Sequence, residues 1–316
     1  MSLHINELYE QFLRQIPSLI EGTRLRINEP LSEHCSFKIG GPADLFAEPN
    51  SETELVQLLK LAITQHIPYF VLGKGSNLLI SDKGMRALVI STDHLTKISR
   101  DDHCISAYAG VLLEDLCNFA LDAGLSGLEF ASGIPGSVGG AVYMNAGAYG
   151  GEIKDVLYNC RCLKPDLEQL ARKNPITYLK NADLALSYRH SILQDTDYIL
   201  VSSVFQLKPD DPALISERMQ DLHRQRWEKQ PMELPSGGSV FKRPEGHFTG
   251  KLIDDCGLRG HRIGDAAISE KHCGFIVNLG KATSQDVLNL IKYVQQSVFD
   301  SFGVILEPEL RLVGEI

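Results

Sequence analysis

The chain has 316 residues, with 31 basic and 40 acidic side chains and a formal net charge of −9. At roughly 150 residues per domain, this length predicts about two domains, each with enough sequence for its own hydrophobic core. The acidic balance argues against a protein that follows nucleic-acid phosphates, because such binding needs a surplus of lysine and arginine. We therefore expect no nucleic-acid partner.

The N-terminal residues contain no basic segment followed by an apolar core, so we expect no secretory signal and a cytoplasmic location. The longest uncharged stretch, 130–151, is long enough for a membrane span, but its glycines, Pro135 and Asn145 make it a poor transmembrane helix. We interpret it as a loop-rich segment and expect no association with membranes.

The seven cysteines are scattered along the chain, without CxxC pairs and without histidines at ligand spacing. This pattern favours buried, reduced thiols and predicts no metal site.

The first predicted elements are a helix and three short strands. Ser51 and Glu54 have the spacing of a capping box, and apolar residues then recur at helical spacing over 52–66. Apolar runs predict strands over 69–72, 78–80 and 87–90. A second amphipathic helix is predicted over 111–123, ending at Gly124, where glycine can adopt the left-handed cap.

Beyond the uncharged stretch, the segments 156–163 and 198–207 have strand patterns that predict an antiparallel or mixed sheet. Asp211 and Pro212 then open a long predicted helix that ends near Lys229, with the proline at the first helical position. The next segment, 230–238, is dense in proline and glycine, and we interpret it as a linker or a functional loop.

The remaining residues form a pattern of short alternating elements: a helix over 250–256, strands over 265–269 and 274–279, a helix over 284–301 and a strand over 304–313. This is a compact α+β unit that could fold around its own core, which predicts a domain boundary at Asp211–Pro212.

Two glycine-rich loops suggest a phosphate-containing ligand, because glycine allows backbone N–H groups to approach an anion closely. The loop Gly73–Asn77 lacks the third glycine of the dinucleotide fingerprint and precedes a short strand, so a Rossmann fold is improbable. No GxxxxGK[ST] motif occurs, which argues against a P-loop NTPase.

Glycines are most concentrated in one segment, where seven of the 27 fall within the 19 residues 133–151. The four glycines and one proline of 133–140 suggest a loop that wraps a large ligand. The alternative is close packing against another backbone segment.

Seven motifs occur in order along nearly the whole chain: 34–44 (HCSFKIGGPAD), 73–77 (GKGSN), 133–141 (GIPGSVGGA), 144–150 (MNAGAYG), 187–191 (SYRHS), 238–244 (GSVFKRP) and 307–309 (EPE). Together they resemble the UDP-N-acetylenolpyruvoylglucosamine reductase family. The short spacing between Tyr188 and Ser239 resembles the spacing in the shorter, second type of this family.

The resemblance implies an α+β fold with a two-part FAD-binding domain of the vanillyl-alcohol-oxidase or p-cresol-methylhydroxylase type. That domain would span 1–211, with its two subdomains meeting near 95–105, and an α+β substrate-binding domain would span 212–316. The implied enzyme is a flavoprotein oxidoreductase of peptidoglycan precursor synthesis. NADPH is the co-substrate, bound FAD transfers hydride from its N5 atom, and UDP-N-acetylglucosamine enolpyruvate is reduced to UDP-N-acetylmuramate.

The resemblance also implies three catalytic residues. Arg189 would stabilise the negative charge that develops beside the substrate carboxylate, since a guanidinium is permanently cationic and matches a planar carboxylate. Ser239 would donate the proton to carbon, with Lys242 or a water as a candidate for returning it. Glu309 would orient the carboxylate region or share a proton with the intermediate.

Other implied contacts follow from the motifs. Tyr188 and Lys242 would bind substrate, and FAD would be held by Gly73, Lys74, Gly75, Ser76, Asn77, Ile134, Pro135, Gly136, Ser137, Gly139, Gly140, Ala141, Asn145 and Ala148. Two departures from the family pattern affect one contact each: Cys35 replaces a common threonine near the cofactor, and Gly274 replaces a larger polar residue near the substrate.

Without the resemblance, Arg189, Ser239 and Glu309 would be read as a surface cation, a loop serine and a solvated strand residue. Two functional alternatives also stay open: another FAD-dependent oxidoreductase of the same fold, and a non-catalytic module that binds a nucleotide sugar or flavin. The sequence identifies no obligate protein partner.

Overall fold

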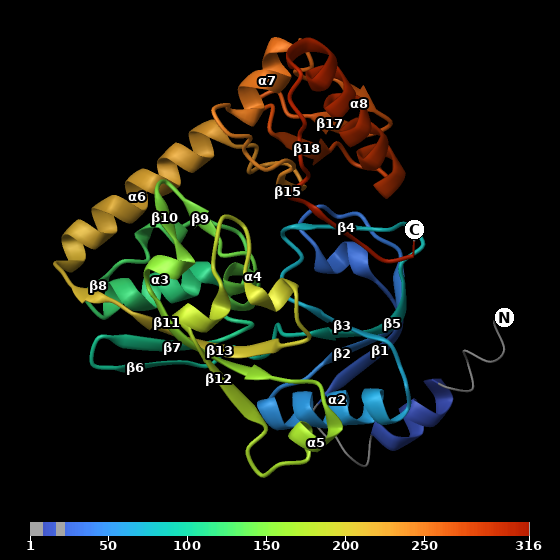
Figure 1. Cartoon of the computed structure of the whole chain (residues 1–316), viewed down its shortest axis with the longest axis vertical. Helices are drawn as coiled ribbons and strands as arrows, with labels where there is room; N and C mark the ends of the chain where they lie inside the picture. Colours follow the sequence, from blue (N-terminus) through green and yellow to red (C-terminus); the bar gives the residue numbers. More distant parts are fainter. Residues whose placement is uncertain (1–8, 17–22, 316) are drawn as a thin grey trace. The chain divides into compact units, whose positions relative to one another are not determined.

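The chain passes several times between two units in the computed structural model, which describes residues 9–16 and 23–315 (Figure 1). The first unit takes in the described residues up to Ile27 together with 45–74 and 87–223, and the second takes in 28–44, 75–86 and 224–315. Four elements continue from one unit into the other: β1 (Arg24–Pro30), β2 (Pro42–Glu48), β5 (Met85–Ser91) and α6 (Pro212–Lys229).

The first unit also contains these helices and strands: a helix over 9–16, α2 (Glu52–Thr64), β3 (Tyr69–Leu72), β6 (Ile98–Asp101), β7 (Cys104–Tyr108), α3 (Leu113–Asp122), β8 (Leu125–Ser126), α4 (Val138–Tyr143), β9 (Gly147–Ala148), β10 (Gly151–Glu152), β11 (Leu157–Leu163), α5 (Leu167–Leu170), β12 (Ile176–Lys180), β13 (Ile199–Gln206) and β14 (Lys208–Pro209). The predicted helices over 52–66 and 111–123 are therefore confirmed, each with slightly shorter bounds.

A five-stranded sheet of order β12-β11-β13-β7-β6 forms the centre of the first unit, and its strands are antiparallel to their neighbours. This confirms the sheet predicted after the glycine cluster. One face is covered by α3 and α4 (Figure 1), whose Leu116 and Val142 join a buried core with Cys160, Cys162 and Phe205. Alternation along β11 sends the two cysteines inward, as a half-buried strand requires.

A second core of the first unit lies under α2. Leu55, Leu58 and Leu59 of this helix pack with Leu88 and Ile90, which come from a four-stranded sheet of order β1-β2-β5-β3. The strands β3 and β5 are parallel, with Leu72 opposite Ser91. Their carboxyl ends therefore reach the same edge of the sheet, which matters for the site below.

Ser51 caps α2 as predicted, because its side chain accepts a hydrogen bond from the Glu54 N–H at 3.2 Å. The reciprocal half of the predicted capping box is not formed. The Glu54 carboxylate instead accepts from the Asn50 N–H at 2.7 Å and from the Thr23 hydroxyl at 2.9 Å. Competition from these two donors explains the difference.

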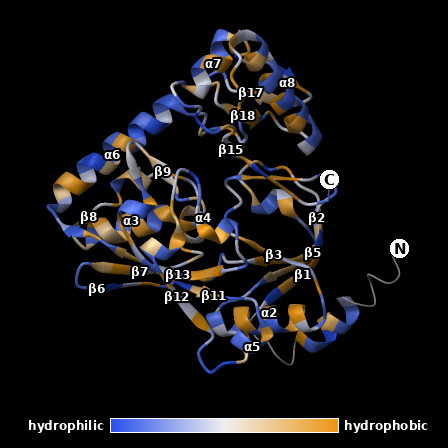
Figure 2. Cartoon of the chain, in the orientation of Figure 1, coloured by the Kyte–Doolittle hydropathy of each residue, from blue (hydrophilic) through white to orange (hydrophobic). Residues whose placement is uncertain are grey.

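The second unit contains β4 (Leu78–Ile80), β15 (Ser236–Ser239), α7 (Thr249–Asp255), β16 (Arg262–Ile263), β17 (Ala266–Ile268), β18 (Phe275–Asn278), α8 (Ser284–Phe302) and β19 (Arg311–Val313). Its main sheet has the order β15-β18-β17-β16, with α8 packed on β16 and β17. In Figure 2 the strand β13 of the first unit is coloured mainly as hydrophobic, whereas much of α6 is hydrophilic.

The segment 130–151, interpreted as loop-rich, also contains α4 and the hairpin β9–β10. Two predictions are corrected by the fold. The segment 230–238, interpreted as a linker or a functional loop, is irregular only as far as Pro235 and then enters β15, which pairs with β18. The predicted strand over 304–313 shrinks to β19, because Pro308 has no N–H to donate and forms only an isolated bridge with Phe241.

The proposed division of function at 211/212 falls just before α6, and the two units described above are defined by packing alone. The assignment of FAD binding to 1–211 and substrate binding to 212–316 stays a prediction. Among the described residues, no helix has the length and apolar character needed to cross a membrane.

Replacing Gly84 by alanine tests how tightly backbone segments pack in the second unit. Gly84 has φ +78°, and a Cβ there would lie 1.9 Å from the Pro42 carbonyl oxygen. Gly257 is a matched control, since its φ is +70° but a Cβ would meet nothing within 4 Å. We expect Gly257→Ala to cost about 1 kcal/mol of unfolding free energy and Gly84→Ala about 3 kcal/mol. Urea unfolding followed by circular dichroism measures both, and equal losses would contradict the packing argument.

Candidate functional site

Gly73, at the carboxyl end of β3, lies against the residue that precedes α4. A Cβ on Gly73 would be 2.8 Å from the Ser137 hydroxyl oxygen. Ser137 is only 1% exposed, and its hydroxyl has no hydrogen-bond partner in the described structure. An unpaired buried hydroxyl is rare in native proteins and commonly indicates a missing water, ion or ligand.

The backbone around Ser137 is held by the segment that follows β7. The Val138 N–H donates to the Val111 carbonyl at 2.8 Å, the Gly139 N–H donates to the Ala109 carbonyl at 2.8 Å, and the Leu113 N–H donates to the Gly136 carbonyl at 3.0 Å. These bonds fix the turn that carries the predicted cofactor residues Ile134, Pro135 and Gly136, and α4 then carries Gly139, Gly140 and Ala141.

Either a positive φ or close packing explains why glycine is needed at six of the seven glycine positions in the cluster 133–151. Gly133, Gly136 and Gly150 have positive φ values. Gly139, Gly147 and Gly151 are required by close packing, for a Cβ would approach Ala109, the Gly151 carbonyl and the Phe130 ring, respectively, within 3.1 Å. Gly140 is exposed and has only the Ser137 hydroxyl at 4.0 Å, so it is free to face a ligand.

Lys74 forms an ion pair with Asp93, which follows β5. The ammonium lies 3.0 Å from Asp93 Oδ2, while Asp93 Oδ1 is buried without a hydrogen-bond partner among the described residues. No sequence motif singled out Asp93. The parallel pairing of β3 with β5 brings it to the glycine loop.

Asn145 is used by the protein itself. Its Nδ2 donates to Glu152 Oε2 and to the Ser187 carbonyl, both at 2.8 Å, and its Oδ1 accepts from the Lys154 N–H at 2.9 Å. The side chain is fully buried and joins the β9–β10 hairpin, which includes Ala148, to the turn at Ser187. Asn145 therefore organises this region of the candidate site.

Arg189 sits in a tight turn, in which Ser187 and His190 exchange two backbone hydrogen bonds of 3.1 Å. Its φ is +56°, its guanidinium donates to the Gly147 carbonyl at 3.0 Å, and it lies 5.0 Å from the centre of the Tyr188 ring. The left-handed backbone of a non-glycine residue is strained, which is frequent at functional sites.

The second unit brings together Ser239 and Glu309, which are far apart in the sequence. Val240 donates its N–H to the Gly274 carbonyl at 2.9 Å and accepts at its carbonyl from the Glu309 N–H at 2.8 Å. The segment 239–242 is therefore held on both sides. Lys242 continues this strand-like segment, and its ammonium pairs with Glu307 at 2.5 Å.

Ser239 also has a histidine in its neighbourhood that the motifs did not assign. A Cβ on Gly274 would lie 3.6 Å from the Ser239 hydroxyl and 3.0 Å from His272 Nδ1. His272 Nδ1 accepts from the Gly274 N–H at 3.0 Å, so the ring proton is on Nε2, and burial lowers the pKa of His272. The glycine at 274 thus leaves room for a neutral imidazole.

The remaining loop residues, Gly75, Ser76 and Asn77, lie in the second unit. Asn77 Nδ2 donates to the Glu309 carbonyl at 3.2 Å, which links the loop to the predicted catalytic glutamate. Gly75 has φ +59° and packs on Cys35, where a Cβ would meet the Cys35 side chain at 2.8 Å. Burial raises the pKa of the Cys35 thiol, and the thiol donates to the Ile39 carbonyl at 3.2 Å.

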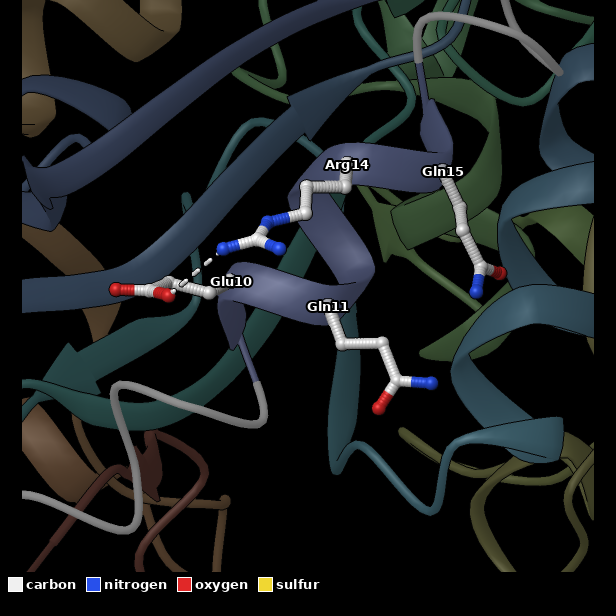
Figure 3. Close-up of a pocket in the computed structure, with 4 residues that line it drawn as sticks. All are labelled: Glu10, Gln11, Arg14 and Gln15. Atoms are coloured by element: carbon white, nitrogen blue, oxygen red, sulfur yellow. Dashed lines mark hydrogen bonds and ion pairs between the residues drawn. The ribbon is translucent and has the colours of Figure 1, made fainter.

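Most of the cysteines are buried thiols. All seven are free, five of them are buried, and burial raises the pKa of Cys117 and Cys160 to about 12. A hollow at the helix over 9–16 is lined by Glu10, Gln11, Arg14 and Gln15 (Figure 3), and Arg14 pairs with Glu10 at 3.4 Å. None of the predicted site residues lines it.

Comparisons with known proteins agree with the motif order. The family model described as the UDP-N-acetylenolpyruvoylglucosamine reductase C-terminal domain matches residues 230–313, and an FAD binding domain model matches 43–170. The UDP-N-acetylenolpyruvoylglucosamine reductase of Caldanaerobacter subterraneus is 46% identical over 97% of this chain and 99% of its own length. That of Agathobacter rectalis is 48% identical over the same shares.

A solved structure gives the same result for the fold. The crystal structure of UDP-N-acetylenolpyruvylglucosamine reductase from Thermus caldophilus is 35% identical, has a TM-score of 0.76, and covers 92% of this chain and 98% of its own. The predicted α+β fold, with an FAD-binding domain and a separate C-terminal domain, is thereby confirmed.

The residues of the first unit fit FAD. Gly73 leaves the Ser137 hydroxyl, unpaired among the described residues, within reach of a ligand atom, and the next residue, Lys74, carries a cation that pairs with Asp93. Hydroxyl and ammonium donors on a glycine-rich backbone suit a diphosphate.

The lowered pKa of His272 predicts a specific loss of stability in acid. The unfolded chain binds a proton at this imidazole near its ordinary pKa of 6.5, whereas the folded protein resists protonation until lower pH. Because the unfolded state binds more protons in that window, stability falls as pH drops below 6.5. We expect His272→Gln to reduce this fall, measured as the urea midpoint between pH 7.5 and 5. The exposed His247, for which His247→Gln should change nothing, serves as control.

Proposed function

The chain belongs to the UDP-N-acetylenolpyruvoylglucosamine reductase family, and we propose that it reduces UDP-N-acetylglucosamine enolpyruvate to UDP-N-acetylmuramate with NADPH in the cytoplasm. It is an FAD-containing oxidoreductase of peptidoglycan precursor synthesis. Bound FAD supplies the transferable hydride. The observation that carries the proposal for this chain is the backbone connection through Val240, which joins Ser239 to Glu309.

Arg189 stabilises the negative charge that develops on the substrate. When hydride adds to the terminal vinyl carbon, the neighbouring carbon and its carboxylate share the new charge as an enediolate. The guanidinium is permanently charged, and the turn around it, with its bond to the Gly147 carbonyl, reduces the freedom of the side chain before substrate binds.

Ser239 delivers the proton that completes the reduction. Among residues 9–16 and 23–315 its hydroxyl makes one long contact, 3.4 Å to the Phe241 carbonyl, and so is weakly held by them. Serine is a weak acid, and its proton must be replaced after each turnover. Lys242 is occupied by Glu307, which favours a water as the group that returns the proton.

Glu309 acts on the carboxylate end of the substrate or shares its proton with the intermediate. Its backbone is fixed by Val240 and by Asn77, so its side chain starts from a defined position. Tyr188 and Lys242 contribute to substrate binding, the first through its exposed ring and the second through its charge. In the first unit the cofactor is held by Gly73, Lys74, the turn 134–137 and α4.

A flavin spectrum tests the proposed activity. Purified protein should be yellow, should be bleached by NADPH without oxygen, and should regain its colour when the enolpyruvyl sugar nucleotide is added. Rapid return of colour with oxygen instead would favour an oxidase of the same fold. Ligand binding without any change of redox state would favour a non-catalytic module, and a colourless protein that takes up no FAD would rule the proposal out.

The role of Ser239 is tested by separating the two half-reactions. Ser239→Ala should leave reduction by NADPH within about twofold of normal, while slowing reoxidation by the sugar nucleotide by at least about a hundredfold, because only the second step needs the proton. Ser297→Ala, on the exposed side of α8, should affect neither rate. Stopped-flow absorbance measures both steps, and equal slowing of the two would argue against proton donation.

A further inference from the structure

Two buried oxygen atoms that have no hydrogen-bond partner in the described part of the chain flank the same dipeptide, Gly73–Lys74. One is the Ser137 hydroxyl oxygen, and the other is Oδ1 of Asp93. Leaving such an atom unpaired destabilises the folded protein, so two beside one dipeptide call for a common explanation.

The two atoms have opposite hydrogen-bonding abilities. The Ser137 hydroxyl can donate, and it is next to the space left by the missing side chain of Gly73. Asp93 is paired with Lys74 through Oδ2 at 3.0 Å, and a carboxylate in an ion pair can only accept. A ligand that satisfies both must therefore present an acceptor near Ser137 and a donor near Asp93.

The fold places these groups where α/β sheets usually bind ligands. Gly73 follows β3 and Asp93 follows β5, and these strands are parallel and adjacent. Asp93 is held there by its N–H, which donates to the Ser91 hydroxyl at 3.2 Å. The carboxyl ends of parallel strands are the usual position for nucleotide ligands.

We propose that Asp93 is a further FAD-binding residue, whose Oδ1 accepts a hydrogen bond from a sugar-type hydroxyl adjoining the diphosphate. A phosphate supplies the acceptor needed near Ser137, and a hydroxyl next to that phosphate supplies the donor needed near Asp93. Such hydroxyls occur on both sides of the FAD diphosphate, on the adenosine ribose and on the ribityl chain. Lys74 offsets the negative charge of Asp93, which otherwise would repel the phosphates. This inference rests on the proposed placement of FAD at the loop 73–77.

The test measures FAD binding, not turnover. Protein stripped of flavin is titrated with FAD, with FAD analogues that lack one ribose hydroxyl, and with analogues that lack one ribityl hydroxyl, and bound flavin is followed by fluorescence. The native chain should bind at least one analogue about tenfold to a hundredfold more weakly than FAD, as expected for a hydrogen bond to a charged group. The analogue that loses affinity identifies which sugar is contacted.

Variants connect that loss to Asp93. Asp93→Ala should bind FAD more weakly by a similar factor and should no longer distinguish that analogue from FAD. Lys74→Met should weaken FAD binding but retain the distinction, because Oδ1 is still present. Asp122→Ala, which removes an exposed carboxylate at the end of α3, should behave as the native chain.

Several results would overturn the inference. A native chain that binds every analogue as tightly as FAD has no such hydrogen bond, whether or not the variants fold. Asp93→Ala that still distinguishes the analogue would assign the contact to another residue. In both cases the proposed function still stands if the native chain reduces the enolpyruvyl sugar nucleotide. A native chain that takes up no FAD would overturn the function and the inference together.

Discussion

Both units depend on backbone segments that approach more closely than a side chain would allow. In the first unit Gly139 rests on Ala109, and in the second Gly84 rests on Pro42 and Gly75 on Cys35. At these positions glycine serves packing as much as flexibility, because the absent Cβ lets two main chains make contact and exchange hydrogen bonds. The positions of Ser137 and of the loop 73–77 follow from these contacts.

The second unit achieves its arrangement through main-chain pairing. Val240 is bonded on one side to Gly274 and on the other to Glu309, so three stretches of sequence contribute to one small region. His272 enters the same region because Gly274 has no side chain to displace its ring. The backbone beside Ser239 and at Glu309 is thus positioned by main-chain hydrogen bonds that do not depend on the side chains there.

Helices and strands that are stabilised by local interactions were predictable from local sequence patterns. Helix α2 and its Ser51 cap, α6 with Pro212 in its first position, and the central antiparallel strands were all predictable from spacing and apolar periodicity. The helix α4 was not, because Gly139 and Gly140 have low helix propensity, and the first turn is held by tertiary bonds from Val138 and Gly139 to 109–111. Arg189, Ser239 and Glu309 came only from resemblance to a family, since nothing in their spacing distinguishes them from surface residues. Asp93 was missed because its significance arises from the pairing of β3 with β5.

The hydrogen bond from Asn77 to the Glu309 carbonyl joins residues separated by 232 positions, and β4 and β19 pair in parallel beside it. Contacts of such long range form late, because the entropy of closing the intervening loop must be overcome first. As the chain is synthesised, the loop that carries Asn77 emerges long before its partner strand. This part of the enzyme is therefore assembled only after residues 311–313 have left the ribosome, and an incomplete chain has no means of forming it.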